Sequence, residues 1–142
     1  MSLRLISILM KANIITDDYF GELTVTKDKQ SQTFYLEKKI GLSTFLDVTL
    51  SLENRNLKAT KKQFELYKLI QDNIQQILIA AEKLYYDNYK VDLYEEFHID
   101  SILINDTEDN FAWELWLLKK GRFENCIIEF DKLAPKHISF SA

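Results

Sequence analysis

The sequence is poor in the residues that define several classes of protein. Its 142 residues include one cysteine, one proline and three glycines. A single cysteine excludes an internal disulfide, and so few turn-forming residues exclude a loop-rich secreted scaffold. No apolar run approaches the roughly 18 residues that cross a membrane. Basic residues are not in excess either, because 18 Lys and Arg stand against 22 Asp and Glu. The net charge of −4 therefore gives no reason to expect nucleic-acid binding.

The first residues lack the features of an export signal. The apolar stretch from Leu3 to Met10 is interrupted by Arg4 and Ser7. A signal peptide needs an apolar stretch of about 7–15 residues and a cleavage site of small residues. We therefore expect a cytoplasmic protein. In that setting Cys126 is interpreted as a small buried side chain rather than a reactive thiol.

Hydrophobic patterning predicts a single α+β domain over residues 1–142. Apolar and polar residues alternate from Phe45 to Glu53, which is typical of a half-buried antiparallel strand. Six further strands are expected, at residues 20–26, 33–40, 101–104, 111–118, 124–130 and 138–140. Pro135 predicts a break in the chain before the last of them.

One long helix is expected after the strongest strand. Thr60 and Gln63 have the spacing of a capping box. Apolar residues then recur every three or four positions from Phe64 to Leu84, and the pattern persists to about Tyr89. The expected fold is an antiparallel sheet of about five to seven strands packed against this helix, residues 60–89.

No motif in the sequence indicates catalysis. Glu95 and His98 have one copy of a spacing that di-iron sites use twice. A calcium loop starting at Asp106 would place Phe111 where glycine is required. The glycines are isolated, so there is no phosphate-binding loop. We predict that the protein is not an enzyme and needs no cofactor or metal.

The acidic residues are concentrated in one block of the sequence. Residues 91–110 hold seven carboxylates and no Lys or Arg, whereas residues 1–60, 61–90 and 111–142 each carry a net charge of +1. Tyrosines flank the block, and such a combination of aromatics and charge is typical of protein-binding surfaces. A solvated loop is the alternative. The candidate partner-binding residues are Asp92, Glu95, Glu96, Asp100, Asp106, Glu108, Asp109, Tyr86, Tyr89, Tyr94 and Trp116.

Trp116 is included because a strand would place it and Trp113 on opposite faces of the sheet. One of the two indoles must then lie off the core. Trp116 shares its face with Glu114 and is the better candidate. It is either covered by the N-terminal segment or available as an interface anchor.

Three features of the sequence belong together: Asp18–Leu23 opens a strand, Leu46–Leu50 is the strong strand, and one helix contains Gln63–Tyr67 and ends in Leu84–Tyr86. This arrangement resembles a group of small bacterial immunity proteins encoded beside polymorphic or contact-dependent growth-inhibition toxins. The resemblance implies a monomer or weak dimer that binds a cognate toxin domain. Many such toxins are nucleases with basic active-site surfaces, which an acidic patch would cover.

Two other functions stay open. A secretion chaperone is also an acidic α+β protein of this size, and it would be an obligate dimer with an extended apolar groove. A small-molecule-binding domain would carry polar or ionisable residues between helix and sheet. The expected helical face from Phe64 to Leu84 offers almost none apart from the Tyr67 hydroxyl.

Overall fold

The computed structural model describes residues 13–43, 46–106 and 112–141, which form one eight-stranded sheet with helices on one face. The strands are β1 (Asn13–Asp17), β2 (Gly21–Asp28), β3 (Thr33–Ser43), β4 (Leu46–Asn54), β5 (Phe97–Ile104), β6 (Ala112–Lys119), β7 (Asn125–Asp131) and β8 (Ala134–Ser141). The helices are α2 (Lys61–Asp72), α3 (Ile74–Tyr89) and the single turn α4 (Leu93–Glu96).

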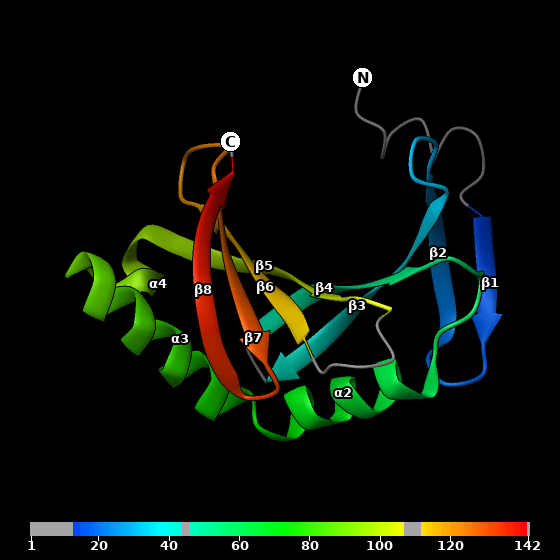
Figure 1. Ribbon diagram of the computed structural model, residues 1–142, viewed down its shortest axis with the longest axis horizontal. Helices are drawn as coiled ribbons and strands as arrows, with labels where there is room; N and C mark the ends of the chain where they lie inside the picture. Colours follow the sequence, from blue (N-terminus) through cyan, green and yellow to red (C-terminus); the bar gives the residue numbers. More distant parts are fainter. Residues whose placement is uncertain (1–12, 44–45, 107–111, 142) are drawn as a thin grey trace.

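The strands lie in the sheet in their sequence order. All neighbouring pairs are antiparallel except β4 and β5, which run parallel at the centre. A parallel pair needs a crossover connection, and the three helices provide it. Figure 1 shows α2 and α3 along one side of the sheet, while the first and last strands rise at its two ends.

Alternation along the strands produces one apolar face. On β4, for example, Val48, Leu50 and Leu52 are at most 1% exposed, and they face the helices. Ile70, Ile77 and Ala81 of the helices are fully buried as well. The core lies between these two layers, as expected when a half-apolar sheet meets an amphipathic helix.

The expectation of five to seven strands packed on one long helix is wrong. The described residues form eight strands and three short helices, so the sheet dominates the fold. The expected helix 60–89 is interrupted at Asn73, whose side-chain amide donates to the Leu69 carbonyl oxygen at 2.8 Å. Asn side chains compete with the main chain for such bonds and disfavour helix interiors. Apolar residues keep the same helical spacing on both sides of Asn73, so the sequence pattern showed no sign of the interruption.

Three strands were also missed or misjudged. β1 was not expected, and β5 begins at Phe97, four residues before the expected start. A register shift between Ile99 and Ser101 disturbs the alternation in β5. Pro135 does not break β8 but lies inside it, because β8 is an edge strand and needs fewer backbone donors.

The predicted capping box is confirmed and extends into a buried network. Thr60 and Gln63 make the two reciprocal bonds that define it. The Gln63 amide also donates to the carbonyl oxygens of Glu53 and Ile104, each at 3.1 Å. Its oxygen accepts from the Asn54 amide at 2.9 Å. Gln63 thus ties the carboxyl ends of the two parallel strands to the start of α2.

No helix in the described part of the chain is long and apolar enough to cross a membrane.

Candidate functional site

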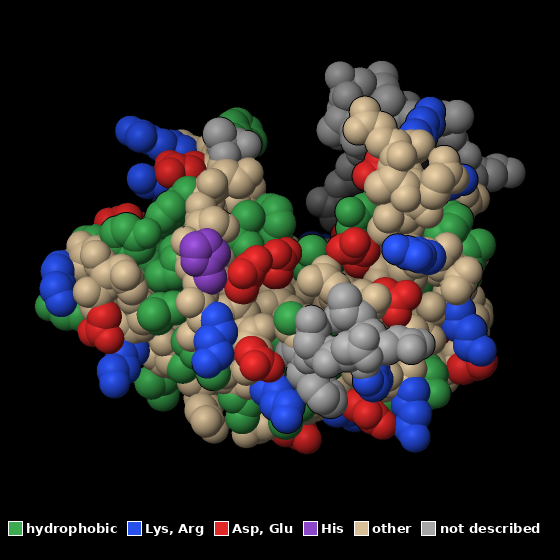
Figure 2. Space-filling model, viewed as in Figure 1, with side chains coloured by type: hydrophobic (Ala, Val, Ile, Leu, Met, Phe, Trp, Pro, Cys, Tyr) green, Lys and Arg blue, Asp and Glu red, His purple; other side chains and the backbone are tan. Residues whose placement is uncertain are grey.

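The face of the sheet opposite the helices is uncovered by any described element, and we call it the open face. Its side chains are those that alternate with the core residues along each strand. The two ends of the sheet rise on either side of this face and leave a hollow between them (Figure 2). Figure 2 shows Asp and Glu side chains gathered in the hollow between the two arms of the sheet.

Carboxylates from five strands share the open face. Among the strand residues that the structure describes, it holds eight carboxylates and one lysine, Lys39. The excess of negative charge on this face is therefore larger than the net charge of the whole chain, −4. The eight are Glu22, Asp28, Glu37, Asp47, Glu53, Glu114, Glu129 and Asp131.

Two of these carboxylates lie directly opposite each other. Glu114 of β6 pairs in register with Glu129 of β7, and Glu129 pairs with His137 of β8. Directly opposite side chains on antiparallel strands have Cβ atoms about 4.5–5.5 Å apart, and like charges in such a pair are destabilising. No ion pair among the described residues neutralises either glutamate. The open face therefore keeps an unfavourable charge pair between β6 and β7.

Beside the Glu114–Glu129 pair, a row of apolar and hydroxyl-bearing side chains crosses four strands of the open face. In register across β4 to β7 it consists of Thr49, Ser101, Trp116 and Ile127. Trp116 is half-buried, and its indole nitrogen donates to the Glu114 carboxylate at 3.1 Å. The placement of Trp113 in the core, 1% exposed, and of Trp116 on the open face confirms that the two point to opposite sides. The open face thus combines aromatic surface with negative charge.

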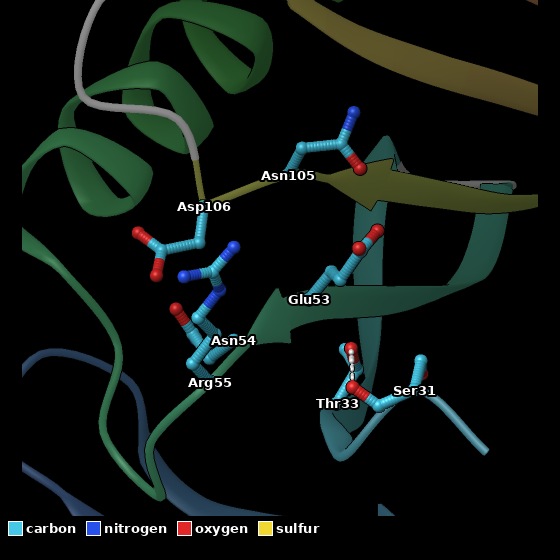
Figure 3. A pocket seen from close by; sticks show the side chains of 7 residues that line it. All are labelled: Ser31, Thr33, Glu53, Asn54, Arg55, Asn105 and Asp106. Carbon is cyan, nitrogen blue, oxygen red and sulfur yellow. Dashed lines mark hydrogen bonds between the residues drawn. The ribbon is translucent and has the colours of Figure 1, made fainter. Parts of the chain in front are cut away.

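A polar pocket of about 540 Å³ lies at one end of the open face, where the parallel strands β4 and β5 end (Figure 3). Burial raises the pKa of Glu53 in this pocket, and the nearby carboxylates of Glu114 and Asp106 raise it further. A carboxylate whose pKa is raised by neighbouring carboxylates favours a cation nearby. The pocket is lined by Ser31, Thr33, Glu53, Asn54, Arg55, Asn105 and Asp106.

Tyr35 joins the same electrostatic group. It pairs in register with Glu53 across β3 and β4. Burial raises its pKa first, and the carboxylates of Glu53, Asp28 and Glu114 add to the effect. Its hydroxyl is protonated at physiological pH and adds no negative charge to those of Glu53 and Glu114.

The structure separates the carboxylates that the sequence block suggested as one patch. Asp92, Glu95 and Glu96 belong to α4, before the start of β5, whereas Asp106 follows its end in the pocket. Eight strand residues at about 3.3 Å each place these groups about 25 Å apart. Asp100 lies between them at the irregularity of β5 and is exposed. The acidic block therefore does not form one cluster, although a partner-binding role for each residue stays a prediction.

The three predicted tyrosines differ in their surroundings. Tyr86 and Tyr89 are 48% and 43% exposed. Tyr94 is half-buried, and its hydroxyl donates to the Leu78 carbonyl oxygen at 2.6 Å. Burial raises the Tyr94 pKa strongly. Tyr94 fastens α4 to α3, so it has a clear structural role, whereas Tyr86 and Tyr89 offer aromatic surface to solvent.

Some of the predictions fall outside the described residues. Glu108 and Asp109 lie there, and so does the N-terminal segment that was one possible cover for Trp116.

Two of the predicted partner-binding residues, Trp116 and Asp106, lie on the open face and in the pocket at its end. Most of the other side chains of the open face were not predicted. Glu114 and Glu129 are far apart in sequence, and only the strand register brings them together. The alternation of Asp47, Thr49, Ser51 and Glu53 was a usable signal, since it showed that one side of β4 is polar.

The site offers little for covalent or metal chemistry. No group of three or more His, Cys, Asp or Glu side chains in the described part of the chain is arranged to hold a metal ion. Cys126 is buried in β7, and burial raises its pKa to about 12. Comparison of the chain with protein-family models, with curated proteins and with solved structures finds no match.

Proposed function

We propose that this chain is a cytoplasmic protein-binding protein that neutralises a cognate bacterial toxin domain by covering its basic active-site surface. The observation that carries the proposal is the open face, on which eight carboxylates and one lysine, Lys39, lie among the described strand residues. The resemblance of the sequence to immunity proteins supplies the class of partner.

The charge of the open face suits a basic partner for two reasons. A concave surface of one sign raises the rate at which an oppositely charged protein is captured, and the effect weakens with salt. In addition, cations of the partner would relieve the repulsion between Glu114 and Glu129. Trp116 and Tyr35 provide the aromatic area that interface centres commonly use.

The binding test compares two pairs of charge reversals with a control. The partner to be tested is a toxin domain encoded next to the gene for this chain, and association is followed by stopped-flow fluorescence over a range of ionic strengths. E114K/E129K changes the charge pair of the open face, and E95K/E96K changes α4. E65K/D72K on α2 is the control, because both side chains are exposed on the helical side and the change in net charge is the same.

We expect E114K/E129K to slow association at least tenfold at low salt and to flatten its salt dependence, because steering accounts for one to three orders of magnitude in rate. E95K/E96K should slow association less, because α4 lies beyond the edge of the open face. The control should differ from the unmodified protein only slightly. Equal kinetics for E114K/E129K and the control would refute the open face as the binding surface.

A growth assay tests the biological role separately. Cells that express the toxin domain should survive when they also express the unmodified chain. They should lose this protection with E114K/E129K and keep it with E65K/D72K. Failure of the unmodified chain to protect, with binding intact, would reject neutralisation while keeping the protein–protein contact.

A further inference from the structure

A second surface, at the end of the molecule where α3 ends and the β6–β7 hairpin turns, exposes a group of large apolar side chains. Phe123, at the tip of the β6–β7 hairpin, is 95% exposed. Tyr86, Tyr89, Val91 and Phe140 are between 39% and 48% exposed. We call these five residues the aromatic end. A fully exposed phenylalanine keeps a large apolar area in water, and grouped exposure of this kind marks interaction surfaces.

Specific contacts bring these side chains to one end of the molecule. The rings of Tyr89 and Phe140 pack edge to face with centroids 5.6 Å apart. The hairpin that carries Phe123 is held against α4, because the Lys120 backbone amide donates to the Glu96 carbonyl oxygen at 3.0 Å. The Lys120 ammonium donates to the Tyr94 carbonyl oxygen at 2.9 Å. The end of α3, α4, the hairpin and the end of β8 are therefore neighbours.

The charges at this end are mixed in sign, whereas those of the open face are mostly negative. Asp92 and Glu95 lie on or beside α4, and Lys90 and Arg122 lie close by on the end of α3 and on the hairpin. Figure 2 shows basic, acidic and hydrophobic side chains mixed at the end where α4 and the hairpin lie. No ion pair within the described residues engages Glu95 or Arg122. A surface that carries unengaged groups of both signs can complement a copy of itself.

We infer that the aromatic end is the interface of a symmetric dimer of this chain. Phe123 of each protomer packs against the Tyr89–Phe140 pair of the other, and Glu95 of each faces Arg122 of the other. A twofold interface uses the same patch on both subunits, so each contact occurs twice. The open face is left free on both protomers, since its excess of negative charge repels a second copy. This inference uses a different surface from the proposed function and does not depend on it.

The first experiment measures the oligomeric state of the full chain by sedimentation velocity. The concentration range is about 1 to about 300 µM, within which modest interfaces dissociate. The unmodified chain of 16.8 kDa should shift from monomer towards dimer as concentration rises. F123D should raise the dissociation constant at least about thirtyfold, the loss expected for a central aromatic anchor. L57D is the control, because Leu57 is 49% exposed in the β4–α2 connection.

A charge exchange tests the orientation of the dimer. E95K alone and R122E alone should each weaken self-association, because each creates two like-charge contacts across the twofold axis. An equimolar mixture of the two variants should associate more tightly than either variant alone, since the mixed dimer has opposite charges at both contacts. Circular dichroism of each variant confirms that it is folded, and these surface changes leave the core untouched.

Three results would overturn the inference. One is a monomer at every concentration of the unmodified chain, which would leave the aromatic end to a different protein. Another is a dimer that F123D weakens no more than L57D does. The third is a dimer that depends on Glu114 and Glu129 instead. None of these results bears on toxin binding, which the open-face variants measure on their own.

Discussion

Replacement of Gln63 by leucine should destabilise the protein more than any other single change to a polar side chain in α2. Gln63 is 2% exposed. Its side-chain nitrogen donates to the Glu53 and Ile104 carbonyl oxygens, and its side-chain oxygen accepts from the Asn54 amide. Leucine fills a similar volume but makes none of these bonds. A buried polar group left without a partner costs about 1–3 kcal/mol. The Thr60 backbone amide, which also donates to Gln63, is half-buried and can turn to water.

With three groups affected at about 1 kcal/mol each, the lower end of that range, the free energy of unfolding should fall by about 3 kcal/mol. That is a large part of the 5–15 kcal/mol expected for a domain. The assay is urea unfolding followed by tryptophan fluorescence, with calorimetry in parallel. The melting temperature should fall by about 10 °C, since 1 kcal/mol corresponds to roughly 2–4 °C at this size.

The matched control is Q76L, because Gln76 is exposed on α3 and should change stability by less than about 0.5 kcal/mol. A loss below about 1 kcal/mol for Q63L would refute the argument, because it would mean that the strand ends find other partners. Equal losses for Q63L and Q76L would point to helix propensity instead of the buried network.

Two further predictions concern protonation. The pKa of Glu53 is raised in the folded state, so ionisation of its carboxyl opposes folding. E53Q should therefore stabilise the protein at neutral pH. Urea unfolding should show this gain fading as the pH falls from the raised pKa towards the ordinary value of 4.5, and no gain below 4.5. A gain that is independent of pH would contradict the electrostatic cause. Burial raises the pKa of Cys126 to about 12, so a disulfide reagent at neutral pH should leave the native thiol unmodified and react fully after unfolding. Rapid reaction of the native protein would show that β7 opens readily.

The sequence by itself determined the local elements. Alternation and the capping box located the strongest strand and the start of α2, because both depend on neighbouring residues. The same reasoning placed Trp113 and Trp116 on opposite faces. It also anticipated that part of the tyrosine group is exposed, as Tyr86 is.

The tertiary structure alone decided where charge accumulates. The acidic block is continuous in sequence but is divided by the length of β5, whereas Glu114 and Glu129 become neighbours through the pairing of β6 with β7. Strand register is fixed by long-range hydrogen bonds and by burial of the opposite face. A linear count of charges contains neither quantity, so it could not identify the open face. The interruption at Asn73 was not predicted for a related reason. Both helices pack on the same core, so apolar residues recur on either side of Asn73 whether or not the helix is continuous.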